Sequence, residues 1–184
     1  MPNIVGIAGS IRRGSYNAAL LRAAASLAPP GCEVEIASIR GIPLYDGDVE
    51  ATEGVPDTVK DLKERIATAD GLLLVTPEYN NSIPGVFKNA IDWLSRPASD
   101  IARVFADRPV ALVGATPGRG GTMLSQAAWL QVLRALGVRF WAGPRTLVPG
   151  ADKVFDEEGR LVDDQVRRQL EAFMAGFARF ATRR

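Results

Sequence analysis

The stretch Ile4-Val5-Gly6-Ile7-Ala8-Gly9-Ser10-Ile11-Arg12-Arg13-Gly14-Ser15-Tyr16-Asn17 decides the fold of this chain. Its first five residues form an almost continuous apolar run, which is the pattern of a central strand buried on both faces. A compact turn with glycines follows, and a helical pattern begins at Tyr16. Where such a turn connects a strand to a helix, the first N–H groups of the helix have no backbone partner. These groups can stabilise an anion. We therefore expect a phosphate site here.

The side chains of this turn support that expectation. Ser10, Ser15 and Asn17 supply short polar groups, and Arg12 or Arg13 can add a charged fork. A purely structural alternative is that Ser15 caps the helix and the glycines only permit a tight turn. That alternative does not account for two arginines at the positive end of a helix, where cations are disfavoured unless an anion is bound.

Two familiar nucleotide motifs fit the turn poorly. Gly9 and Gly14 have the spacing of a P-loop, but Ser15 stands where the phosphate-binding lysine is required. A G-x-G-x-x-G dinucleotide fingerprint is absent, and no acidic residue follows at the distance needed to hold a ribose. A kinase, an NTPase and a six-strand dinucleotide fold are therefore disfavoured.

Length and composition indicate one globular domain, residues 1–184, with a hydrophobic content of 47%. The net charge is only +1, so no global field attracts nucleic acid or an anionic membrane. The N-terminus has no signal-like segment, and no apolar run approaches bilayer length. We expect a cytoplasmic protein with neither nucleic acid nor membrane as a partner.

The sequence contains no histidine, and Cys32 is its single cysteine. Ser-His-Asp and Cys-His catalysis are therefore impossible, as are internal disulfides, Cys-x-x-Cys redox pairs, iron–sulfur clusters and typical zinc sites. We expect no metal, and we interpret Cys32 as a small apolar side chain that packs at the start of a strand. A redox enzyme with this composition needs a bound organic cofactor.

Strand-like and helix-like segments alternate along the whole chain, which predicts an α/β protein with a parallel sheet covered by helices on both faces. Two segments alternate apolar with charged residues and are assigned as edge strands. The expected architecture is a flavodoxin-like three-layer sandwich with five strands in the order 2-1-3-4-5. The predicted strands are residues 4–8, 32–36, 72–75, 110–115 and 138–140.

Apolar residues at helical spacing predict five helices that cover this sheet. The first ends at Pro29-Pro30-Gly31, the second covers about residues 56–68, and the third follows Pro84-Gly85. The fourth and fifth are defined by two apolar stripes, which are Met123, Ala127, Leu130 and Leu133, and then Val162, Val166, Leu170, Phe173, Phe177 and Phe180.

Ligands of such sheets bind beyond the carboxyl ends of the strands, near the switch between the first and third strands. Residues 76–85 combine prolines, Tyr79 and amides, the properties needed around a flat heteroaromatic ring with a polar edge. Residues 116–121 carry three glycines, which allow close approach of the backbone, although a flexible turn is the alternative for that segment alone. Together with the phosphate turn, these loops indicate a mononucleotide site, and FMN is the simplest candidate.

The chain resembles the NADPH-dependent FMN reductases, which include quinone, chromate and azo-dye reductases, over nearly its whole length. Two motifs carry the resemblance. They are Gly9-Ser10-x-Arg12-x-x-Ser15-x-Asn17 and Pro77-Glu78-Tyr79-Asn80-x-Ser82-x-Pro84-Gly85-x-x-Lys88-Asn89-Ala90-Ile91-Asp92-Trp93. The resemblance implies that Ser10, Arg12, Ser15 and Asn17 bind the FMN phosphate beside Tyr16. It further implies that Pro77, Glu78, Tyr79, Asn80 and Ser82 contact the ribityl chain and ring, and that Thr116, Gly118, Gly120 and Gly121 line the other side.

The implied activity is the transfer of a hydride from NADPH or NADH to bound FMN and then, by a ping-pong mechanism, to a quinone, flavin, chromate or azo acceptor. FMN carries the chemistry, so no catalytic side chain is assigned. Glu78 and Tyr79 are close enough in sequence to tune the ring, although for Glu78 we favour backbone contacts and a role in loop structure.

Two other functions remain open: a flavodoxin-type electron carrier that holds FMN without a nicotinamide site, and a non-catalytic nucleotide sensor. Electron carriers of this type are commonly acidic, whereas this chain is near neutral. Four arginines are expected near the mouth of the site and favour an anionic substrate. They are Arg12, Arg13, Arg96 and Arg119.

The family resemblance also suggests a homodimer or homotetramer whose acceptor preference depends on residues 42–46 and on a neighbouring subunit. Trp93 and residues 95–105 are apolar enough to contact that second chain. The alternative is that Trp93 packs inside its own subunit.

Overall fold

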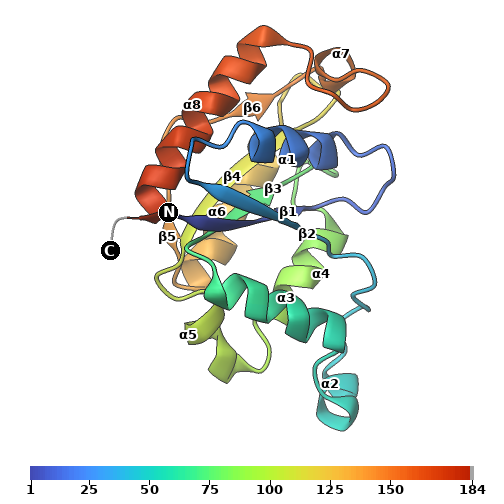
Figure 1. The fold of residues 1–184 in the computed structure, drawn as a ribbon. Coiled ribbons are helices and arrows are strands. Elements are labelled where there is room, and N and C mark those ends of the chain that lie inside the picture. Colours follow the sequence, from blue (N-terminus) through green and yellow to red (C-terminus); the bar gives the residue numbers. More distant parts are fainter. Residues whose placement is uncertain (183–184) are drawn as a thin grey trace.

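The computed structural model describes residues 1–182 and contains a parallel sheet with the strand order β2-β1-β3-β4-β5 (Figure 1). The predicted α/β class, flavodoxin-like order and strand positions are therefore confirmed. A further strand, β6, was not predicted and pairs with the end of β4, where Ala115 lies opposite Val148. The strands are β1 (Asn3–Ala8), β2 (Glu33–Ala37), β3 (Gly71–Val75), β4 (Pro109–Ala115), β5 (Arg139–Phe140) and β6 (Leu147–Val148).

Helices cover both faces of the sheet (Figure 1). One face carries α1 (Tyr16–Ser26), α7 (Ala151–Val154) and α8 (Asp164–Ala181). The other carries α3 (Asp57–Thr68), α4 (Gly85–Leu94), α5 (Ile101–Val104) and α6 (Met123–Ala135), with the 3₁₀ turn η1 (Ala98–Asp100) before α5. The short α2 (Gly47–Glu53) has no buried residue and projects away from the sheet. None of the helices in residues 1–182 is long and apolar enough to cross a membrane.

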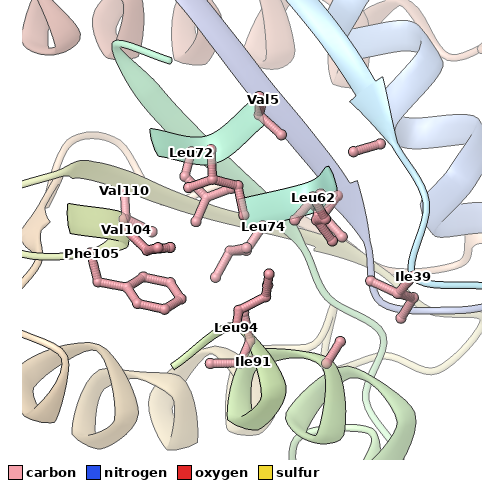
Figure 2. Close-up of a cluster of buried hydrophobic side chains, with 14 of the residues drawn as sticks. Val5, Ile39, Leu62, Leu72, Leu74, Ile91, Leu94, Val104, Phe105 and Val110 are labelled. Carbon is pink, nitrogen blue, oxygen red and sulfur yellow. The ribbon is translucent and has the colours of Figure 1, made fainter. Parts of the chain in front are cut away.

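The central strands supply side chains to two hydrophobic cores because successive residues of a strand point to opposite faces. In β3, Leu72 and Leu74 enter the core under α3 and α4, whereas Leu73 and Val75 enter the core under α1 and α8. Figure 2 shows Leu72 and Leu74 pointing toward α4. All of β3 is buried, as its continuous apolar run predicts.

The inner face of α6 differs from the predicted stripe: Leu133 is buried as predicted, but the prediction was wrong for Met123, Ala127 and Leu130. Met123 and Leu130 are 44% and 46% exposed, and Trp129 faces the core instead. Its Nε1 donates to Thr76 Oγ1 at 2.9 Å, and Thr76 Oγ1 also bonds Ser125 Oγ at 2.9 Å. Polar side chains that are hydrogen-bonded to one another can be buried at little cost in free energy. The spacing of apolar residues therefore predicted the wrong buried face for this helix.

The last helix also begins later than its apolar stripe suggests. Asp163 caps α8 by accepting a hydrogen bond from the N–H of Val166 at 2.8 Å. Val162 therefore precedes the helix and is 53% exposed. From Val166 to Phe177 the predicted apolar positions are buried against the sheet.

Candidate functional site

The predicted phosphate turn connects β1 to α1 at the carboxyl edge of the sheet. Ser15 caps α1, since its hydroxyl accepts the N–H of Ala18 at 3.2 Å, and only 4% of Ser15 is exposed. The guanidinium of Arg12 lies over the ring of Tyr16, 5.7 Å from its centroid. The first turn of α1 contains no acidic residue. An anion at this turn would thus meet the positive end of α1 and an arginine.

Asn17 has a different environment from the other polar residues of the turn. Its side-chain amide donates to the carbonyl of Ala115 at 2.8 Å and accepts the N–H of Ala115 at 2.9 Å. Both ends of the amide are therefore engaged by the end of β4. Asn17 connects the phosphate turn to the loop that follows β4.

The three predicted loops meet at one cavity of about 150 Å³. Each loop follows a different strand of the sheet, and the three strands are neighbours in the order β1-β3-β4. The lining residues are Ser10, Arg12, Ser15, Tyr16 and Asn17 after β1, Pro77, Glu78 and Tyr79 after β3, and Ala115, Thr116 and Pro117 after β4. Asn80, Ser82, Gly118, Gly120 and Gly121 do not line this cavity.

The loop after β3 forms a tight turn that displays Tyr79. Tyr79 and Ser82 exchange backbone hydrogen bonds of 3.2 and 3.0 Å. Asn80 and Asn81 between them have φ values of 50° and 59°, a conformation that asparagine tolerates better than most residues. Tyr79 is 48% exposed, so its ring is accessible to a ligand.

The carboxylate of Glu78 links the second loop to the third. Its Oε2 accepts the N–H groups of Leu124 at 2.8 Å and Ser125 at 3.0 Å, in the first turn of α6. Thr122, the N-cap residue of α6, has a left-handed φ of 67° and makes no capping bond itself. Glu78 therefore caps α6 from a distance, in agreement with the structural role favoured for it above.

The glycines after β4 differ in whether a side chain would fit in their place. A Cβ on Gly118 or Gly120 would have its nearest neighbour 3.6 or 4.0 Å away, an ordinary van der Waals contact, and both positions are exposed. Gly121 has a φ of +56°, and a Cβ there would lie 2.8 Å from the Cβ of Leu147. Gly121 is required by its backbone and by packing against β6, whereas Gly118 and Gly120 leave room beside the loop.

Trp93 packs inside its own subunit, which corrects the expectation that it contacts a second chain. Its side chain is fully buried, and its Nε1 donates to the carbonyl of Pro43 at 3.0 Å. The ring of Tyr45 stands edge-on to it at 5.0 Å. Of the apolar segment 95–105, Val104 and Phe105 are likewise buried. The aromatic side chains of Trp93 and Phe105 therefore belong to the hydrophobic core.

Residues 42–46 are held against α4 by a set of polar contacts that the sequence did not reveal. Asn89 donates to the carbonyl of Pro43 and accepts the N–H of Tyr45, both at 2.8 Å. The hydroxyl of Tyr45 donates to Glu50 at 2.9 Å, and the guanidinium of Arg96 bonds the same carboxylate at 2.8 Å. The hydrogen bond from Arg96 lowers the pKa of Glu50. Arg96 is thus paired at α2 and does not line the cavity.

Cys32 has the environment of a structural residue. Burial raises the pKa of its thiol, and the nearby charge of Asp70 raises it further. The reactive thiolate is therefore disfavoured, as expected for a cysteine that packs beside a strand.

Comparison with known proteins shows which family the chain belongs to. The family model for NADPH-dependent FMN reductase matches residues 2–152. An NAD(P)H-dependent FMN reductase of Pseudomonas aeruginosa is 46% identical over 168 residues, which cover 91% of this chain and 89% of that protein. A 2-hydroxy-1,4-benzoquinone reductase of a Burkholderia species is 38% identical, with coverage of 94% and 92%.

A solved structure of a related flavoenzyme has a similar backbone fold. FerB, a flavoenzyme NAD(P)H:(acceptor) oxidoreductase of Paracoccus denitrificans, superposes with a TM-score of 0.87 and 30% identity. The match covers 98% of this chain and 97% of that one. The phosphate turn, the shared cavity and these relatives lead to one conclusion: the chain belongs to the NADPH-dependent FMN reductase family of oxidoreductases.

Proposed function

We propose that this protein uses the cavity among its three loops to hold FMN and passes electrons from NADPH or NADH to a quinone. The observation that carries the proposal is the meeting of the turns after β1, β3 and β4 at one cavity, with Ser15, Arg12 and Tyr79 on its walls. Relatives named quinone reductase support the acceptor class. Those of Pseudomonas putida and Escherichia coli are 39% and 38% identical to this chain.

The residues present fit FMN. The phosphate turn offers a helix N-terminus, a buried serine and an arginine, which suit a phosphate. The one carboxylate that lines the cavity, Glu78, is bonded to α6 and so is not a free charge facing that phosphate. Gly118 and Gly120 are exposed and carry no side chain, so the backbone there can approach a planar ring.

The protein supplies binding and orientation, whereas FMN, when bound, supplies the hydride chemistry. Ser10, Arg12 and Ser15 would hold the phosphate, with Tyr16 beside it. Asn17 would fix the position of the turn through Ala115. Pro77, Glu78, Tyr79, Asn80 and Ser82 would border the ribityl chain and ring on one side, and Thr116, Gly118, Gly120 and Gly121 on the other.

We further propose that donor and acceptor use the same open face in turn, by a ping-pong mechanism. Tyr79 lines the cavity and is 48% exposed, so it leaves this edge accessible. Flavins, chromate and azo compounds are additional candidate acceptors, since hydride or electron transfer from a flavin needs little beyond access to the ring.

A homodimer or homotetramer is part of this proposal, with a different contact surface from the one that Trp93 suggested. Exposed apolar side chains lie on α6 and on the loop before α2. They are Met123, Leu124 and Leu130, which are 44%, 44% and 46% exposed, and Leu44. Met123 and Leu124 are neighbours at the start of α6, and adjacent exposed apolar side chains are a feature of surfaces that contact another chain.

Spectroscopy and steady-state kinetics test the proposal. The purified protein should be yellow, with about one FMN per chain. NADPH should be oxidised steadily when a quinone is present, and initial-rate plots against both substrates should give parallel lines. Intersecting lines would reject the ping-pong order. Bound FMN that neither nicotinamide nucleotide reduces would instead favour the flavodoxin-type carrier or the nucleotide sensor.

A further inference from the structure

Thr76 follows the last residue of β3 and begins the loop that lines the cavity, although Thr76 itself does not line it. Its side chain is fully buried. Its backbone is held by β4, because its N–H donates to the carbonyl of Val113 at 2.8 Å. A Cβ on Gly114 would lie only 2.2 Å from the carbonyl oxygen of Thr76, so the two backbones are in close contact. Thr76 is therefore a fixed point beneath the loop.

Three hydrogen bonds meet at the hydroxyl of Thr76. Its Oγ1 donates to the carbonyl oxygen of Pro77 at 2.9 Å, and the Nε1 of Trp129 donates to it at 2.9 Å. The third bond joins it to the Oγ of Ser125, also at 2.9 Å. A hydroxyl has one hydrogen, and a carbonyl oxygen can only accept. The hydrogen of Thr76 therefore goes to Pro77, and Ser125 donates to Thr76.

The two donors to Thr76 are themselves held in place. Ser125 and Trp129 are both fully buried, so water does not compete for these bonds. The ring of Trp129 stands edge-on to the ring of Phe87 at 5.0 Å. The backbone N–H of Ser125 donates to the carboxylate of Glu78 at 3.0 Å. Helix α6 thus holds the loop at two points, through Thr76 and through Glu78.

The bond to Pro77 also orients the peptide group between Pro77 and Glu78. This peptide is trans, so its N–H, which belongs to Glu78, points away from the carbonyl that Thr76 binds. Within residues 1–182 the N–H of Glu78 makes no hydrogen bond. Pro77 and Glu78 both line the cavity. The N–H of Glu78 is therefore a donor that the loop can offer to a ligand.

We propose that Thr76 is a positioning residue for the flavin ring. Its bond to the carbonyl of Pro77 turns the N–H of Glu78 toward the cavity, where this N–H donates to an acceptor atom of the ring. Ser125 and Trp129 fix the direction of the Thr76 hydroxyl, so the donor is oriented before the ligand binds. This inference rests on the proposed function, in which the cavity holds FMN.

Binding of two flavins to the flavin-free protein tests this role, because riboflavin has the ring and ribityl chain of FMN but lacks its phosphate. Thr76→Val keeps the shape of the side chain and removes the hydroxyl. The dissociation constants for both flavins should rise about fivefold, the effect of losing one hydrogen bond. Thr76→Ser keeps the hydroxyl and should bind both flavins as the parent does. The matched control is Thr68→Val, which removes an exposed hydroxyl of α3 that also donates to a backbone carbonyl.

The ratio of the two dissociation constants separates Thr76 from the phosphate turn. In Thr76→Val both constants should rise together, whereas in Arg12→Ala only the constant for FMN should rise. Parental affinities in Thr76→Val would overturn the proposal, as would a loss confined to FMN. An equal loss in Thr76→Ser would also overturn it, because the effect would then belong to the packing of the methyl group.

Amide hydrogen exchange, followed by NMR, tests the N–H of Glu78 in the parent protein and does not depend on the folding of any variant. Exchange of this N–H should slow when riboflavin or FMN binds. A parent protein that bound no flavin would overturn the proposed function, whereas flavin binding with unchanged exchange at Glu78 would overturn only this role for Thr76.

Discussion

The side-chain amide of Asn17 and the backbone of Ala115 form a reciprocal pair of hydrogen bonds, 2.8 and 2.9 Å long, between positions 98 residues apart. Through this pair the phosphate turn after β1 is aligned with the loop after β4. Asn17 is only 4% exposed, so water does not compete for either bond.

Asn17→Ala should lower the free energy of unfolding by about 1–3 kcal/mol, because two buried backbone groups lose a partner. FMN affinity should fall as well, since the two loops would no longer be aligned. Urea unfolding and FMN titration measure the two effects, with Gln169→Ala on the exposed side of α8 as the control. A variant with parental stability would mean that Ala115 finds other partners.

Glu78→Ala should weaken FMN binding and lower the free energy of unfolding by about 1–2 kcal/mol, the usual cost of removing a helix cap. Glu78→Gln keeps one accepting oxygen and should lose less. The matched control is Glu171→Gln, which changes an exposed carboxylate of α8. Equal losses in Glu78→Gln and Glu78→Ala would show that the negative charge, rather than the capping geometry, is what α6 requires.

Arg12→Ala should weaken FMN binding by about 1.5–3 kcal/mol, the scale of a charge-assisted hydrogen bond, and should leave the fold intact. Fluorescence titration of the apoprotein with FMN measures the change, and Arg134→Ala serves as the control. Parental affinity in the variant would mean that serines and backbone N–H groups hold the phosphate alone.

Trp93→Glu should unfold or strongly destabilise the monomer by several kcal/mol, because an unpaired charge would replace a fully buried ring. Leu44→Glu alters a side chain that is 84% exposed and should leave the midpoint of thermal unfolding unchanged. Sedimentation equilibrium of Leu44→Glu then reports on assembly alone. A folded, dissociated Trp93→Glu protein would contradict the buried position of the ring.

The ion pair between Lys63 and Asp100, 2.5 Å long, predicts a pH dependence of stability. The hydrogen bond from Lys63, whose side chain is almost fully buried, lowers the pKa of Asp100. A carboxylate with a lowered pKa in the folded state contributes stability above the ordinary aspartate pKa of about 3.9, and this contribution is lost as the pH falls through the lower folded-state value.

Asp100→Asn should therefore be less stable than the parent at pH 7, and the difference should shrink as the pH falls below about 4. Urea unfolding at pH 7, 5 and 3.5 measures this. A difference that stays constant over this range would show that packing, rather than charge, accounts for the loss.

The sequence by itself determined the class of fold and the three loops of the candidate site. Central strands such as β3 are buried on both faces and leave a continuous apolar run, and strand order places their carboxyl ends at one edge. These signals are local, so each can be read from a few adjacent residues.

Only the tertiary structure decided how the loops are connected and which faces are buried. Asn17 engages Ala115, Glu78 caps α6, and Trp93 lies in the core, all through partners distant in the sequence. The strand β6 is two residues long, too short for a periodic pattern. The polar inner face of α6 is buried because Thr76 and Trp129 satisfy each other there, and no periodicity of apolar residues reports a hydrogen bond between separate elements.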